Sequence, residues 1–236
     1  MKYLIVNADD YGASPGVSRG ILEAHERGIL TSASLLVNTS ASETAAVMAR
    51  ATPGLSLGLH ADLTAEMNSP APDLEARLAL ALKSQWQRFE RLMGRAPTHL
   101  DSHHNLHRDP RAQPLFLQLA HAHGVPLREH SPVRYFSNFY GQWAGETHPE
   151  QISPDGLARL LRSAISEGIT ELACHPGYVE RDFATSYAVE RELELKTLCD
   201  PSIRRVLEDE RIQLVNYQLL TPLLKPAEAT ASLCPP

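Results

Sequence analysis

The sequence has few of the features that mark a membrane, disulfide-stabilised or nucleic-acid-binding protein. Cysteine is scarce, because Cys174, Cys199 and Cys234 form an odd-numbered set without C-x-x-C spacing and indicate neither a disulfide framework nor a zinc ribbon. No apolar run approaches the roughly 18 residues that a membrane helix needs. Positive charge is not in excess, since 22 Lys and Arg face 28 Asp and Glu. The net charge of −6 therefore argues against a nucleic-acid partner.

The first residues also lack the pattern of a secretion signal. The apolar stretch Tyr3–Val6 is shorter than the core of a signal peptide, and two carboxylates, Asp9 and Asp10, follow almost at once. Together with the scarce cysteines, this predicts a reducing, cytoplasmic location. With 236 residues, of which 43% are hydrophobic, the chain is long enough to bury a core without disulfide bonds.

Short apolar segments alternate with helical patterns along most of the chain. Seven segments have the length and composition of strands, namely 3–8, 32–37, 55–60, 98–102, 125–128, 169–174 and 212–217. Helices are expected from Ser14-Pro15 to Gly28, over 40–50 and 72–93, from Asp109-Pro110 to Gly124, from Ser153-Pro154 to Gly168, and from Asp200-Pro201. This alternation predicts an α/β fold in which crossover helices join parallel strands, with the sheet either closed as a barrel or open.

One long segment breaks the alternation. Residues 129–152 carry five aromatic side chains without a clear period, and a long aromatic loop in a compact domain either serves the function or covers one end of the fold. We expect residues 1–220 to form a single domain and 221–236 to form an irregular tail. Apolar helix faces leave a homodimer possible.

Histidine, by contrast, is abundant, and several of the eleven histidines lie where predicted strands end. Asp9 and Asp10 end the first strand, His60 ends the third, and His175 ends the sixth. Asp101, His103, His104 and His107 lie at or just after the fourth. Because sites in parallel α/β folds assemble at the carboxyl ends of the strands, we expect these side chains to share one edge.

The alternation of side chains along a strand reduces the number of candidate site residues. Asp101 and His103 would share a face while His104 points away, and His60 would face the centre if the leucines beside it face the helices. Asp9 and Asp10 cannot share a face in a regular strand, but a bend at Tyr11-Gly12 would bring both into the site. A carboxylate with two histidines is a ligand set for Zn²⁺ or another divalent metal, and it leaves a position for water.

A second carboxylate and a further histidine would then supply the base and the acid of a hydrolysis. Each residue taken alone also has a structural explanation: His60 as a hydrogen-bonded core histidine, the Asp pair as a helix cap, and residues 101–107 as a polar loop. Cys174 beside His175 points to the opposite face of its strand, which favours a packed core cysteine over a nucleophile.

Four motifs follow one another along the chain: Asn7–Gly12, Gly58–His60 with Leu63-Thr64, Pro97–His104 and Cys174–Tyr178. At these four places the sequence resembles the YdjC-like carbohydrate deacetylases, which include chitooligosaccharide deacetylases and hopanoid-associated relatives. Weaker matches are Leu127-Arg128, Phe139–Gly141, Ser186-Tyr187 and Arg191-Glu192. Together these matches span about residues 3–217, and their order makes the resemblance specific.

The resemblance implies a distorted (β/α) barrel of about seven strands that removes N-acetyl groups from an amino sugar. It implies a divalent ion, Zn²⁺ or Mg²⁺, held by Asp10, His60 and His103, with Asp9 as general base and His175 as general acid or oxyanion stabiliser. Arg128 would orient Asp9. Further residues expected to contact substrate or ligands are Asp101, Tyr140 and Tyr178.

The chain departs from the family pattern at two places. Asn105 stands where many relatives have another histidine, and the segment between Thr64 and Pro72 is short, which leaves the identity of the sugar open. Three alternatives also stay open: another metal-dependent hydrolase, a two-His-one-carboxylate oxygenase, and a metal-stabilised carbohydrate-binding barrel without turnover.

Overall fold

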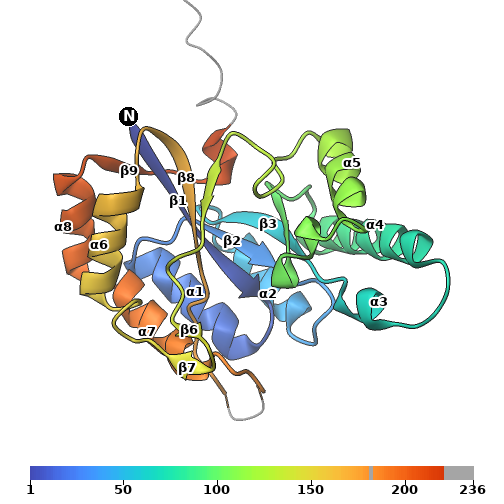
Figure 1. Ribbon diagram of the computed structural model, residues 1–236, viewed down its shortest axis with the longest axis horizontal. Coiled ribbons are helices and arrows are strands. Elements are labelled where there is room, and N and C mark those ends of the chain that lie inside the picture. The colour runs from blue at the N-terminus through green and yellow to red at the C-terminus, as the bar shows by residue number, and fades with distance from the viewer. Residues whose placement is uncertain (181–182, 221–236) are drawn as a thin grey trace, which may run out of the picture.

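In the computed structural model (Figure 1), which describes residues 1–180 and 183–220, one parallel sheet organises the fold. Its seven strands are β1 (Lys2–Tyr11), β2 (Ser32–Leu35), β3 (Ser56–Ala61), β4 (Leu100–Ser102), β5 (Arg134–Phe136), β8 (Gly168–Cys174) and β9 (Ile212–Leu214). They run in the order β4-β3-β2-β1-β8-β5, and β9 pairs with the start of β1. The sheet curls into a half-barrel, so the predicted distorted (β/α) barrel of about seven parallel strands is confirmed.

Helices connect the strands and cover the sheet (Figure 1). They are α1 (Pro15–Arg27), α2 (Ser42–Arg50), α3 (Thr64–Asn68), α4 (Leu74–Met93), α5 (Gln113–His123), α6 (Pro154–Ala164), α7 (Ala188–Leu198) and α8 (Pro201–Asp209). The predicted starts at Ser14, Ser153 and Asp200 are confirmed, since each side chain accepts a backbone N–H of the first turn and a proline follows it. None of the helices described is long and apolar enough to cross a membrane.

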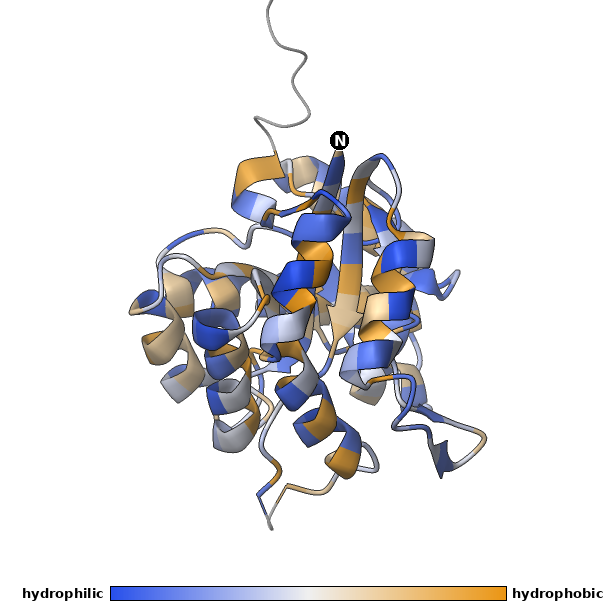
Figure 2. Ribbon diagram, turned by 90° about the vertical axis from the view of Figure 1, so that its left-hand side faces the viewer, coloured by the Kyte–Doolittle hydropathy of each residue, from blue (hydrophilic) through white to orange (hydrophobic). Residues whose placement is uncertain are grey.

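The core lies between the sheet and these helices. The central strand β1 is buried over nearly its whole length because neighbours pair along both of its edges and helices pack on the sheet. In Figure 2 the helices nearest the viewer alternate hydrophobic and hydrophilic residues. The apolar side of α8, formed by Ile203, Val206 and Leu207, is the buried side.

The structure corrects one of the predicted strands and adds others. Residues 125–128 form no strand, because the only bridge there joins Leu127 to Leu100 and the chain turns at Glu129, whose φ is 64°. The edge position is taken instead by β5, which lies inside the segment expected to be irregular. The same segment contains the hairpin β6 (Gln142–Trp143) and β7 (Glu146–Thr147).

Two helix boundaries differ from expectation by several residues. The helix expected from Asp109 begins at Gln113, because the Asp109 carboxylate first accepts the Arg111 N–H in a turn. The helix that starts after Ser153 ends at Ala164, and Gly168 instead opens β8. Helix α7 has no counterpart among the predicted elements. The predicted single domain over 1–220 stays a prediction, and the predicted tail, 221–236, lies outside the described residues.

Candidate active site

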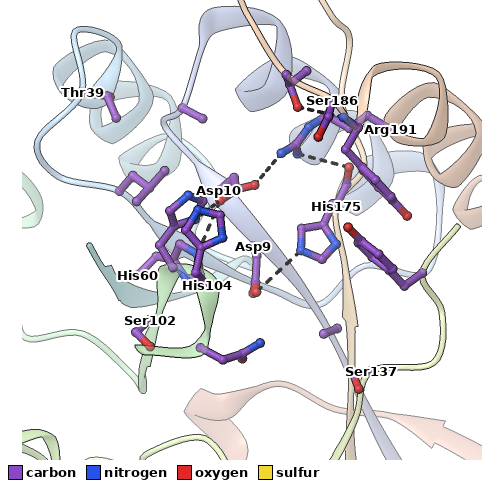
Figure 3. Close-up of a pocket in the computed structure, with 18 of the residues that line it drawn as sticks. Asp9, Asp10, Thr39, His60, Ser102, His104, Ser137, His175, Ser186 and Arg191 are labelled. Carbon is purple, nitrogen blue, oxygen red and sulfur yellow. Dashed lines mark hydrogen bonds and ion pairs between the residues drawn. The ribbon is translucent and has the colours of Figure 1, made fainter. Parts of the chain in front are cut away.

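A cavity of about 680 Å³ opens at the carboxyl ends of the strands. Its walls come from the ends of β1, β3 and β8, from the 3₁₀ helix η1 (His103–Arg108), and from the segment that leads into α7. Figure 3 shows that Asp9 and Asp10 from β1, His60 from β3 and His175 after β8 converge on this space. The predicted shared edge of the sheet is therefore a single pocket, within the size range of ligand-binding sites.

The backbone of Asp10 explains how two consecutive carboxylates reach the same pocket. Asp10 has a φ of 66°, in the left-handed region, and the pairing of β1 with β2 shifts register between Ala8 and Tyr11. This irregularity turns Asp10 to the side on which Asp9 already lies. The bend expected at Tyr11-Gly12 thus occurs one residue earlier.

One group of potential metal ligands at the pocket consists of Asp10, His60 and His103. The Asp10 Oδ1 atom lies 3.4 Å from His60 Nε2 and 3.2 Å from His103 Nδ1, and the three ligand atoms all lie within 4.8 Å of one another. Among the described residues, Asp10 Oδ1 is buried without a hydrogen-bond partner. An orphaned carboxylate oxygen beside two imidazole nitrogens fits a divalent cation.

Asp101 orients one of these imidazoles. Its Oδ1 lies 2.7 Å from His60 Nδ1, so His60 donates Nδ1–H there and turns Nε2 towards Asp10. Burial alone would lower the pKa of His60, but the carboxylates of Asp101 and Asp9 raise it well above its usual value. Burial alone would raise the pKa of Asp10, yet the nearby imidazoles of His103 and His60 and the charge of Arg191 hold it well below its usual value.

A second group, Asp9, His60 and Asp101, also has ligand atoms within 4.8 Å of one another. It is a poor metal site, because Arg128 already fills it with positive charge. The Arg128 guanidinium donates to both oxygens of Asp9, at 2.9 and 2.7 Å, and lies 2.9 Å from Asp101 Oδ2. The Asp10 group is therefore the one that fits an ion.

Arg128 is the centre of a buried charge network below the pocket floor. Besides Asp9 and Asp101 it donates to Glu171 Oε1, and Glu171 Oε2 accepts the Tyr217 hydroxyl at 2.7 Å. Arg128 is 3% exposed and does not line the cavity. It contacts Asp9 in two parallel hydrogen bonds and therefore acts as a positioning residue. Burial raises the pKa of Glu171.

His175 lies across the pocket from the histidine pair. Its Nε2 is 3.9 Å from Asp9 Oδ2, and its ring meets the edges of Tyr140 and Tyr187 at centroid distances of 5.8 and 5.6 Å. Burial lowers the pKa of His175, which favours its neutral form. Asp9 thus stands between the candidate metal group on one side and a histidine on the other (Figure 3).

Of the remaining residues considered from the sequence, some line the pocket and one does not. Tyr140 lines the pocket and stacks on Tyr187. Tyr178 does not line it: the ring is 39% exposed and the hydroxyl donates to Glu23 on α1. His104, expected to point away, lines the pocket together with Asn105, because both residues adopt left-handed backbone conformations with φ of 53°.

Three side chains from α7 and the residue before it were absent from the sequence-based site: Tyr187, Arg191 and Glu194. Arg191 donates to Asp10 Oδ2, and Glu194 accepts the backbone N–H of His175. The signal for two of them lay in the weaker motifs Ser186-Tyr187 and Arg191-Glu192. Without a predicted helix there, nothing placed them beside the pocket.

Comparison with known proteins shows a family match over most of the chain. Residues 3–209 match the YdjC-like protein family. The chain is 35% identical to the carbohydrate deacetylase of Geobacillus stearothermophilus, covering 92% of this chain and 97% of that relative. It is 34% identical to the chitooligosaccharide deacetylase of Enterobacter sp. (strain 638), covering 92% and 98%.

A solved structure shows the same architecture. The crystal structure of a proposed cellobiose-phosphate cleavage protein from Enterococcus faecalis V583 superposes with a TM-score of 0.80 at 27% identity, covering 93% of this chain and 98% of that one. The family match extends over most of the chain, from β1 to α8, and takes in every strand that contributes to the pocket. The chain belongs to the YdjC-like family.

Proposed function

We propose that the protein is a divalent-metal-dependent hydrolase that removes the N-acetyl group from an acetylated amino sugar and releases acetate. The observation that carries the proposal is the division of roles between consecutive carboxylates. Asp10 faces two imidazoles and keeps one oxygen without a partner, whereas Asp9 is held by Arg128 and faces His175. Amide hydrolysis needs an ion site, a base and an acid in this arrangement.

Asp10, His60 and His103 would hold the ion. When bound, it would polarise a carbonyl oxygen and lower the pKa of water. Asp9 takes the proton of the attacking water, and the two hydrogen bonds from Arg128 fix the direction of its carboxylate. Asp9 Oδ2 and His175 Nε2 are 3.9 Å apart, so a proton reaches the neutral His175 over a short path.

His175 then delivers that proton to the nitrogen of the sugar. The bond between the acetyl carbon and this nitrogen breaks, and water supplies the new oxygen of the acetyl product. One proton of the water reaches the nitrogen through His175, and the other leaves with the ionisation of acetic acid, so that the products are acetate and a protonated amine. Because burial lowers the pKa of His175, the imidazole returns readily to its neutral form after each transfer.

The named relatives support a carbohydrate as the small-molecule substrate. The Geobacillus and Enterobacter proteins are named for carbohydrate and chitooligosaccharide deacetylation. The pocket of about 680 Å³ has a stacked Tyr140–Tyr187 pair in its wall, and sugars pack on aromatic rings of this kind. The segment between Thr64 and Pro72, which contains α3, is where the sugar preference would differ from that of longer relatives.

Two alternatives predict different behaviour. A two-His-one-carboxylate oxygenase has no need for the Asp9–His175 pair, and a non-catalytic binding barrel would retain sugar binding without either residue. Both leave unexplained why Asp9 is fixed by a buried guanidinium at hydrogen-bond distance from both of its oxygens.

Acetate release from N-acetylated sugars tests the proposal. The chelated protein is resupplied separately with Zn²⁺, Mg²⁺, Mn²⁺ or Co²⁺, and the substrates range from one sugar unit to several and include a lipid-linked glucosamine. We expect metal-dependent release that falls by about 10²–10⁴ in Asp9→Asn, while ion binding is retained. Release that survives Asp9→Asn would assign the role of base to another residue of a metal-dependent hydrolase. Tight ion binding without any release would favour the oxygenase or the binding barrel.

A further inference from the structure

One helix face contacts both sides of the pocket. Tyr187 immediately precedes α7, and Arg191 and Glu194 follow it at intervals of four and three residues, so the three side chains share one face of the helix. All three are buried, with Glu194 fully inaccessible. Charged side chains are seldom fully buried in a helix that packs on a sheet unless they are paired, so the partners of these three residues indicate what they do.

Arg191 joins two functional groups. One guanidinium nitrogen donates to Asp10 Oδ2, and the other lies 3.3 Å from the backbone oxygen of His175. Asp10 therefore presents Oδ2 to Arg191 and Oδ1 to His60 and His103. Figure 3 shows Arg191 between Asp10 and His175.

Glu194 holds the same histidine from its other peptide group. Its Oε2 accepts the backbone N–H of His175, and its Oε1 accepts the Tyr187 hydroxyl at 2.6 Å. Tyr187 in turn accepts the N–H of Gly141 at 2.7 Å, which connects the aromatic loop to the network. The imidazole itself is not held this way, since its Nδ1 is buried without a partner among the described residues.

We infer that Arg191 and Glu194 are positioning residues through which α7 holds His175 by its backbone and couples it to the ligand carboxylate Asp10. This inference rests on the proposed function, because it treats Asp10 as a metal ligand and His175 as the proton donor. It extends that function by making the ion site and the acid parts of one hydrogen-bonded unit, Asp10–Arg191–His175–Glu194–Tyr187.

The coupling has a consequence that a local packing role would not produce. Among the described residues, Glu194 makes no hydrogen bond or ion pair with Asp10, yet replacing it should weaken ion binding through His175 and Arg191. For Arg191, the direction in which ion affinity changes also distinguishes the two roles. Simple electrostatics predicts that loss of a cation beside a dication site tightens binding, whereas loss of a positioning contact weakens it.

Co²⁺ binding to the metal-free protein, followed by calorimetry and by the visible absorption of the ion, tests the coupling. We expect Arg191→Met to weaken Co²⁺ binding by roughly 10- to 100-fold and Glu194→Met by roughly 2- to 30-fold. The matched control is Glu192→Gln, an exposed residue on the same helix, which should bind as the unaltered protein does. Unchanged or tighter binding in Arg191→Met, or unchanged binding in Glu194→Met, would overturn the inference.

Hydrogen exchange in the metal-free protein supplies a readout that needs neither ion nor activity. Both substitutions should speed amide exchange over residues 174–178 by at least about tenfold while β1 keeps its protection. If a methionine variant does not fold, Arg191→Lys and Glu194→Gln replace it, with effects in the same direction because each loses one of two contacts. If the variants exchange amide hydrogens over residues 174–178 at the wild-type rate, α7 does not position the backbone of His175. Absence of Co²⁺ binding by the unaltered protein would instead contradict the proposed metal site, and the exchange comparison would still decide the role of α7.

Discussion

At the scale of single residues, the site contains carboxylates whose two oxygens have different partners. Asp101 illustrates this, because each of its oxygens accepts from different donors: His60 on one side, Ser34 and Arg128 on the other. An asparagine there has only one acceptor oxygen and would direct its NH₂ group at a donor.

We therefore expect Asp101→Asn to weaken divalent-ion binding by roughly 10- to 100-fold, because His60 loses the partner that fixes its tautomer. Calorimetric titration with Co²⁺ measures the change. Asp109→Asn, which removes an exposed pairing with Arg111, is the control and should leave affinity unchanged. Equal affinity in the Asp101 variant would mean that His60 needs no support from its carboxylate.

Glu194 gives a prediction about pH and stability. Burial raises the pKa of Glu194 from 4.5 to about 8 in the folded protein. Between these values the folded state binds more protons than the unfolded state, so the contribution of Glu194 to stability declines as pH rises from about 4.5 to 8. Glutamine does not titrate and has no such decline.

Unfolding by urea at pH 5.5 and at pH 8.5 measures this effect. The stability of Glu194→Gln relative to the unaltered protein should improve by about 1 kcal/mol or more at the higher pH. Glu192→Gln, at an exposed position of the same helix, should show no pH-dependent difference. A constant gap between the two proteins would show that Glu194 is ionised across the whole range.

At the scale of elements, the helix α1 packs unusually close to the loop that follows His175. A Cβ atom placed on Gly20 would lie 2.6 Å from the Gly177 Cα, and one on Gly16 would lie 2.5 Å from the Tyr178 oxygen. Glycine at these two positions lets the helix backbone approach the loop backbone directly.

Gly20→Ala should therefore push this loop away and lower stability by about 1 kcal/mol or more, since the clash outweighs the gain in helix propensity. The catalytic rate should fall as well, because His175 precedes the displaced loop. Urea unfolding and acetate release check the two effects. Glu26→Ala, on the exposed side of α1, should change neither, and a more stable Gly20→Ala variant would show that the loop yields without cost.

Elements also show where sequence patterns suffice. Apolar strands and Ser-Pro or Asp-Pro helix starts have local causes, so β1, β3, β8 and the starts of α1, α6 and α8 could be predicted. Helix α7 could not, because beside Leu195 and Leu198 it buries four polar residues, Glu190, Arg191, Glu194 and Thr197, which obscure the apolar period. Two of these buried polar side chains, Arg191 and Glu194, hydrogen-bond the pocket residues Asp10 and His175.

The site follows the same division. Asp9, Asp10, His60, His103 and His175 end or directly follow strands, and parallel topology brings such ends together whatever their distance in sequence. The pocket-facing position of His104 and Asn105 depends on left-handed backbone angles, which strand alternation does not predict. The same holds for the turn at Asp10, which differs by one residue from the predicted bend.

At the scale of the whole molecule, an ion at the Asp10 site would stabilise the fold because it binds only the folded chain. At an ion concentration about 100 times its Kd, the gain is about 2.7 kcal/mol. For a chain of this size, this corresponds to a rise in Tm of roughly 5–11 °C. Scanning calorimetry with chelator and with Co²⁺ measures it, and Asp10→Asn should abolish the ion-dependent shift. An equal shift in that variant would place the ion elsewhere.

The curl of the sheet bears differently on the two halves of the site. Asp9 and His175 follow Ala8 and Cys174, which are paired neighbours on adjacent strands, so backbone hydrogen bonds set their separation. Asp10 and His60 come from β1 and β3, with β2 between them. Flattening the half-barrel would therefore draw Asp10 away from His60 while Asp9 stayed opposite His175. The curvature of the sheet thus sets the distance between the two ligands of the ion site.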